Sequence, residues 1–540
     1  MTRLSRLPLG PSAACLLLLA AGACGPEPPS DGRAETDPDR FVVEATIAGL
    51  QDALRSGSLT CREVVDAHRR RIRAYDDSTG VNAVTVLNPE APARADSLDR
   101  VRERGGETGP LHCVPTLVKD NMDTGGMVTT GGSVALEGSV PPDDATIVRR
   151  MRAAGAVVVA KTNMAEWAFS PRQTVSSSFD TTRNAYAPDR VPAGSSGGTA
   201  SGVAASFGLV GLGSDTGNSI RGPSSHLALF GIRSTPGLVS RDGVIPLYFD
   251  RDVVGPMTRT VEDAARVLEV VAGPDTADPY SRLLEGREVG DYASRLDPEG
   301  LEGARVGVLR ALAQPSESDS SVLRLFDRAV ADMREAGAEI VDPLTVPGLG
   351  EHLEADLTCP RFRYDVNRYL ESLGPDAPIR DVATVLETGE YSPYVEGALE
   401  SLTERPGDVP PPEWDPPCPD FWNHPGRQAY RRDVVAAMDS AGVDVVVYPT
   451  WTHPPAHIDS ARAGYRGDNS QLVAPDTGLP AATVPMGFSH GRYPAGLQIL
   501  ARPFDEAAVF RVAGAYERVT GHRRPPEGFP PLSGSPAPRR

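Results

Sequence analysis

Lysine is almost absent from this sequence: of its 54 lysine and arginine residues only two are lysines, Lys119 and Lys161. Arginine supplies positive charge and ion pairs, but it keeps its proton in proteins and so cannot act as a base. A lysine withdrawn from water can lose its proton. Codon usage in a GC-rich genome would also leave few lysines, so the surroundings of each one decide its meaning. Lys119 lies in Val-Lys-Asp-Asn, upstream of a segment rich in serine and glycine.

Positive charge is scarce as well. The formal net charge is −18, and no basic run with interleaved aromatic residues is present. Nucleic acid and anionic membrane surfaces repel such a chain, so neither is expected as the main partner. The chain has 540 residues, of which 40% are hydrophobic and 23% charged, and these values predict a globular protein with a substantial core.

The sequence also lacks the patterns of metal ligands. None of its six cysteines has a CxxC partner, and no histidine cluster accompanies a cysteine. His453 and His457 have helical spacing, but Pro454 and Pro455 between them preclude a helical ligand face. We expect chemistry that uses neither a metal nor a cofactor.

No apolar run near the N-terminus is long enough to span a bilayer. Arginines precede a short apolar stretch at residues 13–20, and Ala-Gly-Ala follows it at residues 21–23. This order predicts a cleaved export signal over residues 1–23. Cys24 follows as in a bacterial lipobox, although the usual leucine is missing, and residues 24–40 form a Pro-rich tether. The sequence favours a lipoprotein anchored at Cys24 in the bacterial cell envelope over a periplasmic or secreted form.

Export would expose the remaining cysteines to an oxidising environment, where they can pair. These cysteines are Cys61, Cys113, Cys359 and Cys418, and four cysteines allow three pairings. Our preferred pair is Cys359 with Cys418, because both lie in the same irregular region.

Helical and strand patterns alternate along most of the chain. Amphipathic helices are predicted at residues 44–54, 144–154, 322–336, 431–441 and 505–519, with a further helix opening at Thr60 in a capping box. Short apolar strands are predicted at residues 155–161, 306–309, 339–341, 443–448, 482–484 and 497–500. This alternation predicts an α/β fold, in which helices cover both faces of a sheet.

One large domain accounts for this pattern, and we assign it to residues 41–525. Within it, residues 350–430 are rich in proline and aromatic residues and poor in strand signals, which predicts an irregular, partly helical insertion. Residues 526–540 are predicted to form a loose Pro-rich tail.

Serine and glycine dominate residues 192–222. A flexible linker would not enclose apolar groups such as those at 203–205 and 209–212, so the glycines indicate tight turns and close backbone approach. The small residues from Thr199 to Ser206 suit a closely packed helix. Pro223 suits the first turn of another helix, and Ser219 just before it would meet free N–H groups that favour an oxyanion.

Three familiar catalytic motifs match the sequence poorly. Residues 194–198 fit G-x-S-x-G, but the nucleophile elbow must follow a strand and the preceding residues are polar and turn-like. Residues 155–162 nearly match a phosphate loop, yet Ala160 replaces the second glycine. Neither lysine follows a serine at the spacing of penicillin-binding enzymes.

The combination of segments resembles the amidase signature family. The resemblance rests on two linked segments, Gly-Ser-Ser-Gly-Gly at 194–198 and Gly-Ser-Asp-Thr-Gly-Asn-Ser-Ile-Arg at 213–221. Further segments at 118–121, 160–167, 255–259 and 477–481 lie on either side of these two in the expected order, so the similarity spans roughly residues 41 to 520. The Glu-Trp pair after Lys-Thr-Asn looks most like the peptide amidase branch. The resemblance implies a large mixed β-sheet with helices on both faces.

The resemblance further implies a Ser–Ser–Lys triad. Ser219 would be the nucleophile, Ser195 the bridging serine after a cis peptide bond, and Lys119 the base. A serine needs a base to attack at neutral pH, and a lysine kept neutral by burial can serve through a relaying hydroxyl. The oxyanion would be stabilised by backbone N–H groups of Thr216, Gly217, Asn218 and Ser219.

Three residues near this triad need separate interpretation. Asn218 occupies a position that is often glycine in the family; if the turn requires positive φ, asparagine is the least costly replacement, and activity should survive. Lys161 is interpreted as a structural residue that ends a buried strand. Ser196 is either a hydrogen-bond donor supporting the triad or a packing residue.

The predicted function is hydrolysis of a carboxamide, in a peptide or another small molecule, to an acid and ammonia or an amine. Amidotransferase components that work on charged tRNA belong to the same family, but the export signal and the acidity oppose that role. A catalytically inactive envelope lipoprotein that binds peptides or cell-wall fragments is the other alternative, and it would not need the complete triad. The insertion contains no motif that identifies the amide substrate.

Overall fold

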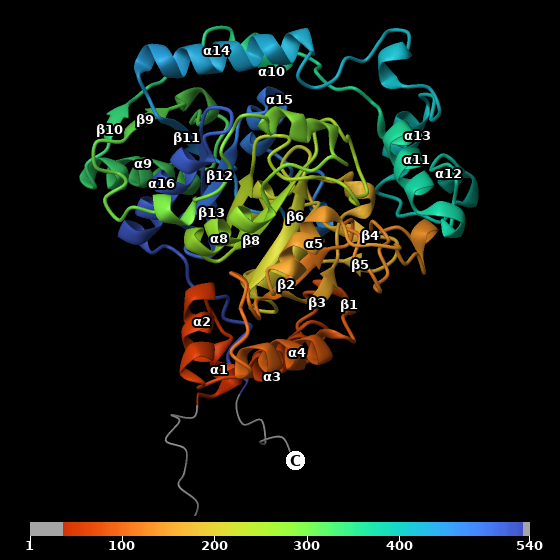
Figure 1. Cartoon of the computed structure of the whole chain (residues 1–540). Helices are drawn as coiled ribbons and strands as arrows, with labels where there is room; N and C mark the ends of the chain where they lie inside the picture. The colour runs from red at the N-terminus through yellow and green to blue at the C-terminus, as the bar shows by residue number, and fades with distance from the viewer. Residues whose placement is uncertain (1–35, 533–540) are drawn as a thin grey trace, which may run out of the picture. The chain divides into compact units, whose positions relative to one another are not determined.

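The computed structural model describes residues 36–532, and a sheet of 11 strands runs through them (Figure 1). The strand order is β1-β3-β2-β6-β8-β7-β12-β13-β11-β9-β10. Pairs β2–β3, β2–β6, β9–β10 and β9–β11 are parallel, whereas the remaining neighbours are antiparallel. The predicted mixed α/β sheet is therefore confirmed. The predicted signal peptide and Cys24 lie outside the described residues.

Each predicted strand is present, and two of them, β12 and β13, are longer than predicted. The hairpin of β12 and β13 extends furthest, because the two strands pair along their whole length up to the turn at residues 490–492. The strands of the large sheet are β1 Val84–Leu87, β2 Pro115–Lys119, β3 Val157–Thr162, β6 Val210–Asp215, β7 Phe230–Arg233, β8 Val253–Thr258, β9 Arg305–Val308, β10 Glu339–Val341, β11 Val445–Pro449, β12 Ala481–Ser489 and β13 Tyr493–Leu500. A separate small hairpin joins β4 Val175–Ser176 to β5 Asp180–Thr181.

The predicted helices are also present. The α-helices are α1 Pro38–Phe41, α2 Ile47–Ser56, α3 Cys61–Tyr75, α4 Ala91–Glu103, α5 Thr146–Ala153, α6 Gly197–Ala204, α7 Arg221–His226, α8 Val261–Val271, α9 Ser320–Glu335, α10 Leu349–Glu354, α11 Phe362–Ser372, α12 Thr384–Thr388, α13 Glu396–Thr403, α14 Pro425–Ala441, α15 Ala474–Thr477 and α16 Glu506–Thr520. The predicted capping box at the start of α3 is confirmed, since the side chains and backbone of Thr60 and Glu63 satisfy each other.

Strand β11 shows how the sheet is buried on both faces. Successive side chains of a strand point to opposite faces. Val445 and Val447 pack in the hydrophobic cluster that contains α8, α9 and α16. Val446 and Tyr448 pack in a different cluster, which contains α14. Helices therefore cover both faces, and the strand is apolar throughout because neither side meets water.

Both ends of the predicted domain need correction. Residues 38–40 are predicted to belong to the tether, but they begin helix α1, where Asp39 is buried and paired with Arg70 at 2.9 Å. Residues 526–532 are predicted to belong to a loose tail, but Phe529 is buried and packs edge-on against Phe207. The guanidinium group of Arg71 donates to the carbonyl of Phe529. A Pro-rich sequence lacks a periodic signal, so these long-range contacts could not be read from it.

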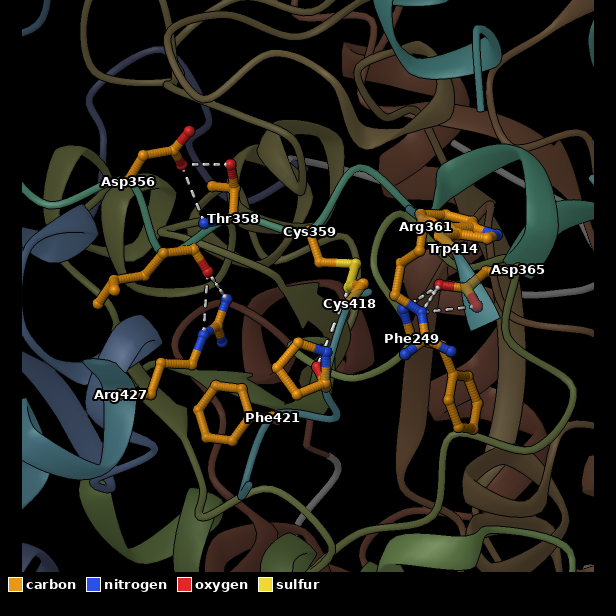
Figure 2. Close-up of a disulfide and its surroundings, with 12 residues drawn as sticks. Phe249, Asp356, Thr358, Cys359, Arg361, Asp365, Trp414, Cys418, Phe421 and Arg427 are labelled. Atoms are coloured by element: carbon orange, nitrogen blue, oxygen red, sulfur yellow. Dashed lines mark hydrogen bonds and ion pairs between the residues drawn. A yellow bond between two sulfur atoms is a disulfide. The ribbon is translucent and has the colours of Figure 1, made fainter. Parts of the chain in front are cut away.

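The insertion at residues 350–430 consists of short helices without a strand among its described residues, as predicted. Helices α11, α12 and α13 lie together in Figure 1, and buried side chains such as Val366, Val385 and Leu399 form their common core. The preferred disulfide, Cys359–Cys418, closes this insertion (Figure 2). Cys61 and Cys113 form the second disulfide and join α3 to the segment before β2.

Replacing both Cys359 and Cys418 by serine is expected to lower the free energy of unfolding by about 3 to 4 kcal/mol, because the bond closes a chain loop of 59 residues and so restricts the unfolded state. Urea unfolding in a non-reducing buffer measures this change. Adding a reductant should lower the midpoint of the wild-type protein further than that of the variant, because the variant has already lost this bond. Equal midpoints for the variant and the wild type without reductant would contradict the prediction.

Candidate active site

Lys119 is the last residue of β2, which lies between β3 and β6 near the middle of one half of the sheet. Its side chain is fully buried. The amine Nζ lies 2.7 Å from Ser195 Oγ, 2.7 Å from Ser214 Oγ and 3.4 Å from the carbonyl oxygen of Ser214. Ser214 is in β6, the parallel neighbour of β2, so the carboxyl ends of the two strands bring these groups together.

Burial lowers the pKa of Lys119 to about 7, although the nearby carboxylates of Asp252 and Asp215 act in the opposite direction. A neutral amine has two N–H groups and one lone pair. Ser214 offers two acceptors for the N–H groups, which leaves the lone pair free to receive the hydroxyl hydrogen of Ser195. The arrangement suits a base that withdraws a proton from Ser195 near neutral pH.

Ser214 is a residue of this site that the sequence reasoning missed. Its Oγ is shared between Lys119 and the side-chain amide of Asn121, whose Nδ2 donates at 3.0 Å. Both Ser214 and Asn121 lie in segments already quoted for the family resemblance, one residue from Asp215 and two residues from Lys119. A serine at the end of a strand neighbouring the lysine strand was the signal that could have identified it.

Ser195 follows a cis peptide bond to Gly194, as the resemblance implied. Backbone hydrogen bonds hold this turn: the N–H of Gly194 donates to the carbonyl of Pro171, and the N–H of Ala165 donates to the carbonyl of Ser195. A β-carbon at Gly194 would lie 2.3 Å from the carbonyl oxygen of Ser170, so only glycine fits there. Ser195, the predicted bridging serine, is thus fixed by its backbone.

Ser219 lies in the loop between β6 and α7, and only 4% of its surface is exposed. Its Oγ donates to Oδ1 of Asn218 at 3.4 Å, and no hydrogen bond joins it to Ser195 within residues 36–532. Lys119 and Ser195 are therefore in direct contact in this structure, whereas the third predicted residue has its hydroxyl turned to its own neighbour. Turning about one side-chain bond is the motion that would redirect it.

Asp215 anchors the loop that carries Ser219. Its Oδ2 accepts the backbone N–H of Ile220 at 3.1 Å, and Arg221 and Arg233 form ion pairs with it. Burial by itself raises the pKa of Asp215, but the two guanidinium groups outweigh burial and hold the pKa at about 2. The carboxylate stays ionised and keeps its hydrogen bonds over the working pH range.

The loop after β6 presents unused backbone donors. In the described chain, the N–H groups of Gly217, Asn218 and Ser219 donate to no protein acceptor. Thr216 is held by its side chain, whose hydroxyl donates to Asp252. A β-carbon at Gly217 would lie 2.0 Å from Oε1 of Gln471, so a larger residue there would require the flexible side chain of Gln471 to move. Such free N–H groups beside a serine hydroxyl are suited to binding a developing oxyanion.

The condition under which Asn218 would replace glycine for its backbone, a turn with positive φ, is not met. Asn218 does not belong to the residues with positive φ in the described chain. Its side chain instead makes specific contacts: Nδ2 donates to the carbonyl of Pro171 at 3.1 Å and to Oδ2 of Asp468 at 2.9 Å. What distinguishes Asn218 from a glycine at this position is its side-chain contacts and not its backbone conformation.

Lys161 and Ser196 take places that fit supporting roles. Lys161 Nζ donates to the carbonyl of Met122 at 2.8 Å and to Thr129 Oγ1 at 2.6 Å, and it lies 3.5 Å from Asp120. These partners belong to the loop after β2, so Lys161 ties that loop to β3. Ser196 Oγ donates to the carbonyl of Ser214 at 3.1 Å, which favours the donor interpretation over simple packing.

Residues 36–532 contain neither a candidate metal site nor a candidate membrane-spanning helix. No group of three or more His, Cys, Asp or Glu side chains has the arrangement of a metal site there. No helix in the same range is long and apolar enough to cross a membrane.

Several known proteins are similar to this chain in sequence over most of its length. The sequence model of a family described as Amidase matches residues 63–510. The chain is 34% identical over 505 residues to a glutamyl-tRNA(Gln) amidotransferase subunit of Synechococcus sp. strain CC9902, covering 88% of this chain and 96% of that protein. The corresponding protein of Symbiobacterium thermophilum is 33% identical, with the same shares of both chains covered.

Solved structures are similar over the same extent. The native peptide amidase of Stenotrophomonas maltophilia superposes with a TM-score of 0.80 at 35% identity, covering 91% of this chain and 99% of that one. An amidase family protein of Bacillus anthracis gives a TM-score of 0.79 at 27% identity, covering 91% of this chain and 93% of that one.

Proposed function

Since the chain belongs to the amidase signature family, we propose that it hydrolyses the C–N bond of a carboxamide by a Ser–Ser–Lys triad. Ser219 is the nucleophile in this proposal, Ser195 the relay and Lys119 the base. The observation that carries it is the buried Lys119 amine, 2.7 Å from Ser195 Oγ, with its pKa lowered to about 7.

The reaction begins with proton transfer along the three side chains. The hydroxyl of Ser219 turns towards Ser195, Lys119 accepts the proton of Ser195, and Ser195 accepts that of Ser219. Ser219 Oγ then attacks the amide carbon, and the free N–H groups of the loop after β6 bind the oxyanion.

Collapse of the tetrahedral intermediate breaks the C–N bond. The bonding electron pair stays with nitrogen, which receives a proton from Ser195 as Lys119 returns its own to Ser195. The acyl group remains on Ser219. A water molecule then repeats the sequence as nucleophile, and the acid product leaves.

The alternative within the family is a component of an amidotransferase, which the names of the curated relatives favour. The predicted export signal and the net charge of −18 oppose work on charged tRNA. A catalytically inactive envelope protein that binds peptides is less consistent with a buried lysine held between two serine hydroxyls, because binding alone needs no base.

An activity screen of the purified protein tests the proposal. The panel contains C-terminally amidated peptides, fatty amides and aryl acylamides, with release of acid and amine as the readout. Reaction with a fluorophosphonate probe is measured in parallel. Hydrolysis of at least one class supports the proposal. Inactivity across the panel with no probe reaction would overturn it in favour of the binding-protein alternative.

We further propose that the protein is exported and lipid-anchored at Cys24, a residue outside the described range. Replacing Cys24 by serine is then expected to move the protein from the membrane fraction to the soluble fraction, because the acylated residue is lost. Fractionation of cells producing each form, followed by immunoblotting, measures the shift. An unchanged distribution would contradict the anchor.

A further inference from the structure

The side-chain amide of Asn218 has a fixed orientation. Its Nδ2 group has two hydrogens, and both are used, one by the carbonyl of Pro171 and one by Oδ2 of Asp468. Both partners are acceptors, so exchanging the amide nitrogen and oxygen would place acceptor against acceptor. Asp468 is held in turn by Tyr465, whose hydroxyl donates at 2.9 Å, and by the hydroxyl of Ser470. Oδ1 of Asn218 therefore points away from Asp468 and Pro171.

That oxygen lies beside the reacting groups. It accepts the hydroxyl of Ser219 at 3.4 Å. The carbonyl of Pro171 that binds Nδ2 also accepts the N–H of Gly194, the residue before Ser195. One carbonyl thus joins the Asn218 amide to the turn that carries Ser195. A fixed hydrogen-bond acceptor therefore stands next to the predicted nucleophile, and it loses its donor when the hydroxyl of Ser219 turns towards Ser195.

The chemistry of an amide creates a use for such an acceptor. As Ser219 adds to the carbon, the amide nitrogen loses its planarity and its lone pair must face the proton donor, Ser195. The remaining N–H then points elsewhere and needs an acceptor in a site that excludes water. The leaving oxygen of an ester has no hydrogen, so it gains nothing from the same group.

We propose that Asn218 Oδ1 accepts an N–H of the scissile amide nitrogen and thereby makes the enzyme select amides over esters of the same acid. The inference rests on the proposed hydrolysis at Ser219 and names the substrate class of that site more narrowly. Asn218 neither gives nor accepts a proton in this step. The leaving nitrogen receives its new proton from Ser195, and it keeps the hydrogen that is hydrogen-bonded to Asn218 Oδ1. A site built around a substrate N–H discriminates against analogues without one.

The experiment compares two substrates with the same acyl group, an unsubstituted amide and a methyl ester. Because kcat/KM reports formation of the acyl-enzyme, the deacylation step that both substrates share does not affect the ratio of their kcat/KM values. Replacing Asn218 by glycine, the residue often found there in the family, is expected to lower kcat/KM for the amide by about 30-fold. The ester should change by less than about 3-fold.

Asp468→Ala is the matched variant, since it breaks the tie to Asp468 and leaves Oδ1 of Asn218 in the chain. Because only the carbonyl of Pro171 then orients the amide, it should lower the amide-to-ester ratio in the same direction as Asn218→Gly but by a smaller factor. An equal loss on both substrates in Asn218→Gly would overturn the inference and make Asn218 a structural tie. If Asn218→Gly no longer reacts with the fluorophosphonate probe, the amide-to-ester ratio of Asn218→Ala decides in the same way.

The proposed function and this inference fail separately. Wild-type protein that hydrolyses neither amide nor ester overturns the proposed function and the inference with it. Wild-type protein that hydrolyses both, with an amide-to-ester ratio unchanged in Asn218→Gly, overturns only the inference.

Discussion

Replacing Lys119 by arginine is expected to lower kcat/KM for an amide by about 10⁴-fold, because the positive charge is kept while the ability to accept a proton is lost. In the wild-type protein the lysine must be neutral to act. Its pKa of about 7 therefore predicts that kcat/KM rises as the pH increases through about 7 and levels off above it. Initial rates across this pH range measure both effects.

The second lysine supplies the control. Lys161→Arg alters a buried residue that contacts the loop after β2 and not the predicted relay. The Lys161→Arg substitution should change the free energy of unfolding, whereas the pH at which kcat/KM rises should be the same as in the wild-type protein. Normal amide hydrolysis by Lys119→Arg would refute the neutral-base role outright, since arginine does not deprotonate in this range.

Replacing Ser219 by alanine is expected to abolish covalent labelling by a fluorophosphonate probe and to lower amide hydrolysis by about 10⁴-fold or more. The probe reacts only with an activated nucleophile, so its loss assigns the reacting oxygen. Intact-mass spectrometry after incubation with the probe detects one added group on the wild-type chain and none on the variant.

Ser201→Ala is a suitable control for this experiment, because Ser201 belongs to the same Ser/Gly segment but donates its hydroxyl to the carbonyl of Arg183. It should label as the wild type does. Labelling that persists in Ser219→Ala would place the nucleophile elsewhere. Ser196, whose hydroxyl donates to the carbonyl of Ser214 near the end of β6, would be the next candidate.

Several features were accessible without a structure because they depend on local pattern. The alternation of helices and short apolar strands predicted the α/β sheet, and the capping box at Thr60 marked the start of α3. The order of the family motifs along the chain predicted that Lys119, Ser195 and Ser219 form one site. The lysine count alone did not separate Lys119 from Lys161; only the neighbouring segments did.

Other features depended on contacts between residues distant in the chain. Periodicity ends where proline enters, so the packing of Phe529 and the short helix at residues 38–41 were missed. Four cysteines allow three pairings, and the preference for Cys359–Cys418 rested on their shared region, while the contact itself depends on how the insertion folds.

The sequence by itself determined the alternating α/β pattern, the family and the residues able to carry acyl-transfer chemistry. Each of these depends only on the types of residues and on short spacings between them. Only the tertiary structure decided how those residues are supported. Ser214 faces Lys119 because β2 and β6 are parallel neighbours in register, and Asn218 meets Asp468 across a separation of 250 residues. Such contacts follow from strand register and packing across the whole sheet, which no local pattern encodes.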